Sequence, residues 1–333
     1  MKAILALTMG DINGVGPEIL AKVFSDRRLF DFATPVVLGC VNAYEEARVE
    51  THSGLPSIQV DSLDAAQDIS DALPFLRCDV VAPHRVPGTL SADAGRAAMQ
   101  WLDLAIELAK AGDVDGIVTG PINKQGIHLA GYTVRGHTDY IAEKTASTDY
   151  RMCLFTEDTR LVHISDHVSL RESLNYVTVD RIVQSVRIGF DALKRVGDTG
   201  RDIAVAGLNP HAGEAGAFGR EEIDIIAPAV EQCRAEGIPC SGPYSPDTVF
   251  KRALDGEFAM VIAMYHDQGH IPLKLAKMDD GVNVTLGIPI VRTSVDHGTA
   301  YDIAGKNMVS EKSLCVAYKM AAQLSVTRGI RTS

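Results

Sequence analysis

The chain has 333 residues, of which 46% are hydrophobic and 23% are charged. This composition excludes a disordered chain, and the length suits one large domain or two of ordinary size. The formal net charge of -11 argues against a nucleic-acid partner, because phosphate backbones are bound through clustered Lys and Arg. An anionic small substrate remains compatible with this charge, provided that its binding site is built locally.

The sequence predicts neither a membrane anchor nor a disulfide framework. No apolar run approaches the roughly 20 residues that span a membrane. The apolar start of the chain ends at Gly10, which is too short for a signal peptide and suits a buried first strand. The six cysteines are scattered without a C-x-x-C pair, which favours reduced thiols. We therefore expect a cytoplasmic protein.

Short apolar runs alternate with longer amphipathic segments along the chain. The predicted strands are Ile4–Met9, Pro35–Gly39, Gly116–Thr119, Arg160–Ile164, Ile203–Gly207 and Met260–Met264. The predicted helices are Ala92–Ala111, Arg181–Arg195, Glu221–Glu236 and Ser313–Leu324. Apolar strands separated by helices are typical of parallel strands that helices cover on both faces. We predict an α/β fold with mainly parallel sheets.

The loop-rich segments 126–136 and 237–247 are candidate domain crossings. We expect a discontinuous first α/β domain, residues 1–128 plus 246–333, and a second α/β domain, residues 129–245.

Three histidines each follow the end of a predicted strand: His167, His211 and His266. Ligands of an open α/β sheet bind beyond the carboxyl ends of its strands, so such loops gather side chains from distant parts of the sequence. Neutral imidazoles gathered there suit a divalent metal with an open position for substrate. Alternatively, each histidine is a loop or core residue with its own hydrogen bond. Their separations, 44 and 55 residues, match no compact metal motif.

Other polar residues suit an anion. The segment 136–139 opens a predicted helix, where free N–H groups and the Thr138 hydroxyl favour negative charge, although an ordinary N-cap explains it equally. Lys274, Asn283 and Arg292 lie in apolar, strand-like stretches, and Lys124 follows a strand. A buried cation needs a partner, which is either a ligand anion or a nearby carboxylate.

Two glycine-rich loops lack the usual nucleotide fingerprints. The first, MGDINGVGPEI, is neither G-x-G-x-x-G nor a P-loop, and we interpret it as a tight turn. The second, SVDHGTAYDIAGKN, combines flexible backbone with several polar groups and is a candidate for cofactor binding.

Taken together, these segments resemble the 4-hydroxythreonine-4-phosphate dehydrogenase family. The matching stretches run in order from residue 9 to 305: MGDINGVGPEI, TGPINK, GHTDYIAE, GLNPHAGE, PDTVF, AMYHDQGHIPLK, DGVNVTLG and RTSVDHGTAYDIAG. The resemblance implies the two-domain fold of isocitrate and isopropylmalate dehydrogenases. It also implies a homodimer whose active cleft lies at the domain and subunit boundary.

The resemblance assigns roles to individual residues. It implies that His167, His211 and His266 bind one divalent metal, for which imidazole ligands favour zinc or cobalt-like ions over magnesium or manganese. Substrate-binding positions are matched by His137, Thr138, Lys274, Asn283 and Arg292. The NAD or NADP loop is matched by His297, Gly298, Thr299, Asp302 and Asn307.

Two departures from the family pattern bear on the substrate. Ile12-Asn13 stands where the family commonly has Pro-Ala, which we expect to change only the stiffness of the turn. His270 in GHIPLK differs from the vitamin B6 biosynthetic members and resembles a branch of four-carbon sugar-acid catabolism. The expected substrate is therefore 4-phospho-D-threonate or 4-phospho-D-erythronate, with 4-phosphohydroxy-L-threonine as the biosynthetic alternative.

The expected reaction is an oxidation at C3 followed by decarboxylation. A divalent metal would acidify the reacting hydroxyl and stabilise the enolate. Asp247, Asp267 and Lys274 are candidates for moving protons or orienting other groups. The alternatives are a dihydrodiol dehydrogenase of an aromatic acid, a metal-dependent sugar-phosphate hydrolase or aldolase, and a non-catalytic binding protein.

Overall fold

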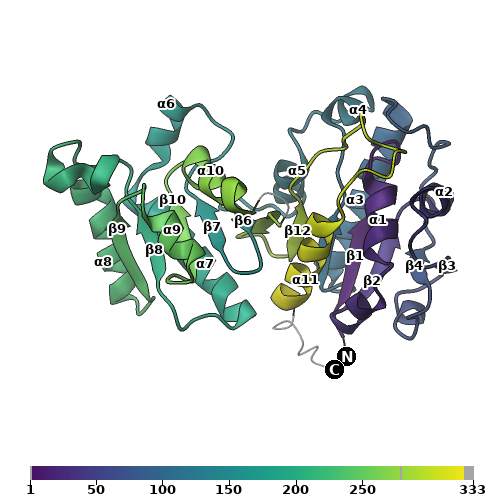
Figure 1. Cartoon of the computed structure of the whole chain (residues 1–333), viewed down its shortest axis with the longest axis horizontal. Coiled ribbons are helices and arrows are strands. Elements are labelled where there is room, and N and C mark those ends of the chain that lie inside the picture. Colours follow the sequence, from purple (N-terminus) through teal and green to yellow (C-terminus); the bar gives the residue numbers. More distant parts are fainter. Residues whose placement is uncertain (1, 278–279, 326–333) are drawn as a thin grey trace. The chain divides into compact units, whose positions relative to one another are not determined.

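The computed structural model describes residues 2–277 and 280–325, and it divides into two compact units. Unit 1 comprises Met1–Thr148 and Ile288–Ser333, and unit 2 comprises Asp149–Gly287 (Figure 1). The chain leaves the first unit and returns to it, at crossings about 20 and 42 residues later than we expected from the sequence.

The sheet of unit 1 is entirely parallel, in the order β3-β4-β2-β1-β5-β12. Its strands are β1 (Ile4–Thr8), β2 (Thr34–Leu38), β3 (Ser57–Val60), β4 (Leu73–Leu76), β5 (Gly116–Thr119) and β12 (Arg292–Val295). The central strands β1, β2 and β5 are buried along their whole length. Strands with this burial carry apolar residues on both faces, which is why their sequences read as continuous apolar runs.

Helices cover this sheet. They are α1 (Gly16–Val23), α2 (Val41–Thr51), α3 (Ala92–Ala111), α4 (Lys124–Leu129), α5 (His137–Lys144) and α11 (Lys312–Ser325). Figure 1 shows α1 and α11 in front of the sheet and α3 behind it. Helix α3 begins where the Ser91 hydroxyl accepts a hydrogen bond from the Ala94 amide, and it ends at Gly112 with a left-handed φ of 80°. Short 3₁₀ turns occupy Arg27–Asp31 and Asp64–Ala66.

The sheet of unit 2 mixes directions, in the order β11-β6-β7-β10-β8-β9. Its strands are β6 (Arg151–Phe155), β7 (Arg160–His163), β8 (Ile203–Ala206), β9 (Cys240–Tyr244), β10 (Met260–Ala263) and β11 (Val282–Leu286). Strands β7, β10, β8 and β9 are parallel to one another, whereas β6 pairs antiparallel with both β7 and β11. The parallel strands therefore end on one edge of the sheet.

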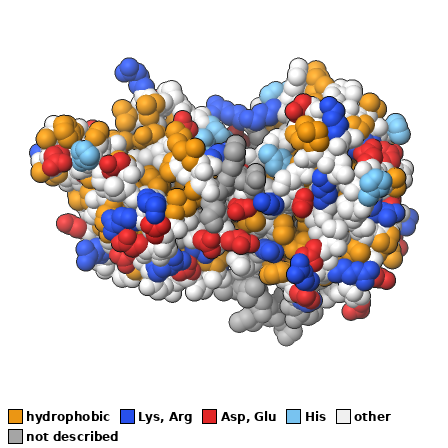
Figure 2. Space-filling view, in the orientation of Figure 1, with side chains coloured by type: hydrophobic (Ala, Val, Ile, Leu, Met, Phe, Trp, Pro, Cys, Tyr) orange, Lys and Arg blue, Asp and Glu red, His pale blue; other side chains and the backbone are white. Residues whose placement is uncertain are grey.

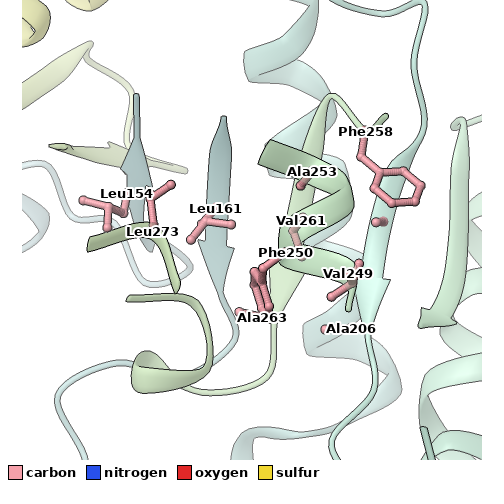
Figure 3. Packing of buried hydrophobic residues seen from close by; sticks show 11 residues of the cluster. Leu154, Leu161, Ala206, Val249, Phe250, Ala253, Phe258, Val261, Ala263 and Leu273 are labelled. Atoms are coloured by element: carbon pink, nitrogen blue, oxygen red, sulfur yellow. The ribbon is translucent and has the colours of Figure 1, made fainter. Parts of the chain in front are cut away.

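The helices of unit 2 are α6 (Leu170–Ser173), α7 (Val179–Val196), α8 (Ala227–Ala235), α9 (Val249–Leu254) and α10 (His266–Lys277). Shorter helical turns occupy Leu174–Tyr176, Pro210–Gly216 and Glu222–Ile226. A buried cluster joins α9 and α10 to the sheet, with Phe250 and Ala253 from α9 and Leu273 from α10 packed among residues of β6, β7, β8 and β10 (Figure 3). This packing fixes α10, which begins at the predicted metal ligand His266.

The predicted α/β class with mainly parallel strands is confirmed. All six predicted strands exist, and each ends within a residue of its prediction. The stretch around Lys274 is an exception, because we expected a strand there and it lies in helix α10, which also contains Pro272. Short apolar runs of this kind have no periodicity that separates a strand from a helix. The predicted helix Glu221–Glu236 begins instead with a π-helical turn at Glu222–Ile226.

Three further observations concern membrane-spanning helices, the distribution of surface charge and the cysteines. Within the described residues, no helix is long and apolar enough to cross a membrane. Acidic and basic side chains are interspersed on the visible face of each unit and form no basic stripe (Figure 2). All six cysteines are free thiols, as predicted.

Candidate functional site

The three predicted metal ligands follow neighbouring strands of unit 2. Strands β7, β10 and β8 lie side by side and run parallel, and His167, His266 and His211 follow their respective carboxyl ends. The topology therefore places all three loops along one sheet edge, as we expected from the strand pattern.

Two of these histidines face each other. The ring centroids of His167 and His266 are 5.7 Å apart. Metal–nitrogen bonds of about 2.1 Å on one tetrahedral ion would place two imidazole centroids about 5 Å apart, so this pair has nearly the spacing that a shared ion requires. Asp267 supports this geometry, because its Oδ1 lies 2.7 Å from Nδ1 of His266. A proton on Nδ1 leaves Nε2 of His266 unprotonated, so that its lone pair can bind a metal ion.

The third histidine is not gathered with the other two. His211 has a 62% exposed side chain, and its Nδ1 lies 3.9 Å from Oδ2 of Asp247. The Ser245 hydroxyl, which donates to Asp247, and the nearby His211 lower the pKa of the Asp247 carboxyl. Across residues 2–277 and 280–325, no three His, Cys, Asp or Glu side chains are arranged to hold a metal ion. The donor types fit a divalent metal, and two of the three predicted ligands have a fitting distance.

An unusual backbone carries His211. Residues 211–215 all have positive φ, including 51° at His211 and 43° at Glu214, a conformation that side chains other than Gly rarely adopt. The buried Glu222 carboxylate holds the start of this loop, because it accepts hydrogen bonds from the backbone N–H groups of Leu208 (2.8 Å) and Asn209 (2.7 Å). Burial alone would raise the pKa of Glu222, but the bonds from Asn209 and Leu208 lower it overall. The carboxylate thus stays charged at neutral pH.

A second buried residue ties the same strand ends together. The Gln268 side chain accepts from the Met264 amide at 2.7 Å and donates to the Gly207 carbonyl at 2.8 Å. It therefore links the start of α10 to the loop that follows β8. Neither role was predicted, because Glu222 lies in a segment that we predicted as an ordinary helix and Gln268 lies in a segment for which we predicted no helix.

A buried pair of histidines lies behind His266. His163 Nδ1 lies 3.2 Å from the Met152 carbonyl, so this nitrogen carries the proton. His163 Nε2 is then the acceptor for His270 Nδ1, at 3.1 Å. The His270 ring in turn stacks on His266, with centroids 3.8 Å apart and an interplanar angle of 9°. Burial lowers the pKa of His163 to about 4, which keeps this chain of hydrogen bonds neutral.

Gly269 makes this pair possible. A Cβ atom at Gly269 would lie 2.9 Å from His163 Nε2 and 3.2 Å from the Ala263 Cβ, so only glycine leaves room for the imidazole.

Unit 1 holds a candidate anion site at the start of α5. Arg292 is buried on β12 and donates to Thr119 Oγ1 at 3.0 Å and to Thr138 Oγ1 at 3.4 Å. Burial lowers the pKa of Arg292 to about 9, and the lowered value means that a bound anion would stabilise its charge. Nε2 of His137 is buried and has no hydrogen-bond partner in the described part of the chain. Burial and the neighbouring Arg292 hold the pKa of His137 well below its usual range, so the ring is neutral.

The other predicted substrate residues are distributed differently. Asn283 lies on β11 and Lys274 on α10, so both belong to unit 2, whereas Arg292, Thr138 and His137 share unit 1. Lys124 opens α4 and is exposed.

The predicted nucleotide loop has a fixed backbone, and two of its predicted binding side chains are exposed. The Thr299 carbonyl accepts from the Val15 amide at 3.0 Å, and the Tyr301 hydroxyl donates to Asp11 at 2.7 Å. The side chains of Asp302 and Asn307 are exposed. Nε2 of His297 is buried without a hydrogen-bond partner among residues 2–277 and 280–325, which suits a bound polar group. Gly298 is exposed beside it and leaves the approach open.

The first glycine loop does more than turn the chain. The Asn13 side chain accepts from the Val86 amide and donates to the Thr89 carbonyl, both at 2.8 Å. The expectation that Ile12-Asn13 changes only the stiffness of the turn was therefore wrong. A long-range side-chain contact of this kind has no local signal in the sequence.

Comparisons with known proteins identify the family of this chain. The family model described as pyridoxal phosphate biosynthetic protein PdxA matches residues 31–321. The D-threonate 4-phosphate dehydrogenase of Pectobacterium atrosepticum is 43% identical over 329 residues, covering 98% of this chain and 100% of the relative. The 4-hydroxythreonine-4-phosphate dehydrogenase of Desulforapulum autotrophicum is 40% identical, covering 98% of this chain and 97% of the relative.

Solved structures show the same relationship. The 4-hydroxythreonine-4-phosphate dehydrogenase of Klebsiella pneumoniae superposes with a TM-score of 0.87 at 41% identity, covering 98% of each chain. A terephthalate 1,2-cis-dihydrodiol dehydrogenase of Burkholderia xenovorans has a TM-score of 0.69 at 28% identity, with 96% of this chain and 98% of that chain covered. The dehydrogenase names support the predicted oxidoreductase that acts on a CH–OH group. The chain belongs to the PdxA family of pyridoxal phosphate biosynthetic proteins.

Proposed function

We propose that this protein oxidises 4-phospho-D-threonate at C3 with NAD or NADP and then decarboxylates the product. The choice of substrate rests on the similarity to two D-threonate 4-phosphate dehydrogenases, which are 43% identical over 98% and 96% of this chain. Relatives named for 4-hydroxythreonine 4-phosphate reach 40–41% identity, so the same reaction on the amino acid is the second candidate.

The proposed reaction balances without a further reactant. The C3 hydride passes to the nicotinamide, and the C3 hydroxyl releases its proton. The resulting 3-keto acid breaks its C1–C2 bond, carbon dioxide leaves, and C2 takes up a proton. The product is dihydroxyacetone phosphate.

The anion site of unit 1 supports a phosphorylated substrate. The phosphate would accept hydrogen bonds from the backbone N–H groups at the start of α5 and from the Arg292 guanidinium. Neutral His137 would donate through Nε2, the buried nitrogen that has no hydrogen-bond partner in the described residues. Holding the phosphate fixes C3 relative to the cofactor, which is the positional contribution to catalysis. A dihydrodiol of an aromatic acid carries no phosphate, so these buried groups disfavour that alternative.

A divalent metal is part of the proposal. His167 and His266 would bind it at their present spacing, and His211 would complete the set; zinc is the ion that three imidazoles favour. When bound, the ion would polarise the substrate hydroxyl and the keto oxygen. Asp267 would keep His266 in the tautomer that offers Nε2. Asp247, beside His211, and Lys274, on α10 with His266, are the proposed groups for moving or orienting protons.

His270 is the residue that we propose to contact C2, the position at which the sugar acid and the amino acid differ. His270 Nδ1 donates to His163 Nε2, which leaves Nε2 of the neutral His270 ring able to accept a hydrogen bond. We propose that this ring region accepts a hydrogen bond from the C2 hydroxyl of the substrate.

We propose the nucleotide and a second copy of this chain as partners, and the cytoplasm as the compartment. The 297–307 loop would bind the nucleotide, through His297, Gly298, Thr299, Asp302 and Asn307. A homodimer would cover the apolar side chains of Ile271 and Leu275, which are one helical turn apart on α10 and are 56% and 84% exposed. Six free thiols fit a reducing cytoplasm.

The test measures products and metal together. Protein loaded with zinc, NAD and 4-phospho-D-threonate should release one carbon dioxide for each nucleotide reduced. His211→Ala should abolish both products and reduce metal retention, whereas His84→Ala, at an exposed histidine of unit 1, should change neither. Normal turnover and normal metal content in His211→Ala would overturn the ligand assignment. Reduced nucleotide without carbon dioxide would overturn the decarboxylation.

A further inference from the structure

We infer that Glu18 is a positioning residue for the nucleotide, because its buried carboxylate holds the backbone of the 297–307 loop in one conformation. This inference rests on the proposed role of that loop in binding the nucleotide. Glu18 lies in the first turn of α1, in a segment that the sequence analysis interpreted only as a tight turn.

Both carboxylate oxygens of Glu18 accept hydrogen bonds from backbone amides of the loop. Oε1 accepts a hydrogen bond from the Gly305 amide at 2.5 Å, and Oε2 accepts one from the Asn307 amide at 3.2 Å. These two amides flank a turn in which Gly305 has φ 76° and Asn307 has φ 56°. Asparagine adopts left-handed backbone more readily than most residues, and the two bonds to a single carboxylate hold Asn307 in this conformation.

The neighbour on the other side of Glu18 is a buried cation. Arg85 Nη2 lies 3.6 Å from Glu18 Oε1, and both side chains are almost fully buried, at 1% and 0% exposure. Two partly exposed carboxylates, Glu50 at 2.8 Å and Glu46 at 3.9 Å, complete the set around Arg85. Opposite charges at this distance in a dry interior hold each other in place, so the carboxylate that grips the loop is itself fixed.

A second residue of α1 grips the same turn from the carbonyl side. Lys22 Nζ donates to the Asn307 carbonyl at 3.2 Å and to the Val309 carbonyl at 2.7 Å. One turn of helix thus binds the N–H and the C=O of Asn307, while the Asn307 side chain remains exposed. A fixed backbone with exposed polar side chains lowers the ordering cost of binding a ligand.

The expected consequence is a weaker affinity for the nucleotide alone. A glutamine at position 18 keeps one carbonyl oxygen and turns an NH₂ group toward one of the two loop amides, so one of the two bonds is lost. If the loop then holds its binding conformation for about a tenth of the time, the apparent Kd for nucleotide rises about tenfold. The anion site uses other residues of unit 1, so the affinity for the phosphorylated substrate should stay the same.

The test compares four variants of the full-length protein with wild type by calorimetric titration with NAD and NADP. Glu18→Gln should raise the Kd and the KM for the nucleotide about tenfold, with kcat at saturating nucleotide and the KM for 4-phospho-D-threonate changed less than twofold. Lys22→Met, which removes no buried charge, should raise the nucleotide Kd about threefold. Hydrogen exchange should accelerate in both variants in peptides that cover residues 299–309.

Two further variants separate the possible failures. Glu50→Gln removes an ion-pair partner of Arg85 without touching the loop, so it should leave the nucleotide Kd unchanged even if it lowers stability. Asp302→Ala alters an exposed side chain of the loop and should weaken nucleotide binding. If Asp302→Ala weakens binding while Glu18→Gln and Lys22→Met do not, the positioning role is refuted and the proposed function stands. If exchange accelerates but all variants bind nucleotide normally, the nucleotide loop itself is assigned wrongly, and both proposals fall.

Discussion

Replacing Glu222 with glutamine should destabilise unit 2 and disable the loop that carries His211. The Glu222 carboxylate is 3% exposed and accepts three hydrogen bonds, from the Leu208 amide, the Asn209 amide and the Asn209 side chain. A glutamine oxygen still accepts the two amides without charge assistance, while its NH₂ group meets the NH₂ group of Asn209. A hydrogen bond to a charged group contributes about 1.5–3 kcal/mol and a neutral one about 1 kcal/mol. The expected loss is about 3 kcal/mol.

The pH dependence of this loss identifies its cause. The folded-state pKa of Glu222 is lowered from its ordinary value of 4.5, so its stabilising contribution is present above pH 4.5 and is lost as the pH falls through the folded-state pKa. Urea unfolding followed by circular dichroism should therefore show wild type and Glu222→Gln far apart at pH 7 and converging as the pH falls below 4.5.

Glu221→Gln is the matched control, because the Glu221 side chain contacts only the Asn209 side chain, at 2.7 Å, among the hydrogen bonds described for this loop. It should cost less than about 1 kcal/mol, as surface contacts do. A Glu222→Gln protein within about 0.5 kcal/mol of wild type at pH 7, or a difference that does not change with pH, would refute the role assigned to the carboxylate.

Three further substitutions test the site. Arg292→Met should raise the KM for the phosphorylated substrate by at least about tenfold, because a charge-assisted bond to phosphate contributes roughly 1.5–3 kcal/mol, and it should leave the nucleotide KM unchanged. A substrate KM equal to that of wild type would show that Arg292 is not part of the anion site. Gly269→Ala should cost about 1–3 kcal/mol of unfolding free energy, since its Cβ would lie 2.9 Å from His163, and a stable variant with unchanged metal affinity would contradict the packing argument. Leu273→Ala should cost about 3 kcal/mol through the cavity that it leaves under α10, as measured by thermal unfolding, and a loss below about 1 kcal/mol would show that α10 is held by other contacts.

Strong local patterns predicted much of the fold. The strand Gly116–Thr119 and the helix Ala92–Ala111 match the structure to the residue. The first is a β-branched run between two glycines, and the second has a serine cap and a terminal glycine. Strands β3, β4, β6 and β9 were not predicted, whereas β11 and β12 lie in the stretches around Asn283 and Arg292 that we described as strand-like. Strand β3 has only one fully buried residue, Val60, among its four, and β6 begins with the buried Arg151, so neither has a clear apolar period.

In the candidate site, too, residues with a local pattern were predicted and residues that act through long-range contacts were not. Histidines after strand ends were visible in the sequence, and the topology places their loops on one edge. The residues that hold them were not visible, because Glu222 and Gln268 act through contacts formed only in the folded chain. His163 stands at the end of a predicted strand, but its pairing with His270 joins residues 107 positions apart. Supporting residues of this kind require the structure, whereas ligand-type residues carry a chemical signature of their own.

The central claim is that this chain oxidises a phosphorylated four-carbon sugar acid. The most direct test is the initial rate of nucleotide reduction by zinc-loaded protein with 4-phospho-D-threonate and with 4-phosphohydroxy-L-threonine, each offered with NAD and with NADP. We predict a kcat/KM at least about tenfold higher for 4-phospho-D-threonate, with dihydroxyacetone phosphate as the product. A higher kcat/KM for 4-phosphohydroxy-L-threonine would contradict the claim and place the enzyme in the biosynthetic branch.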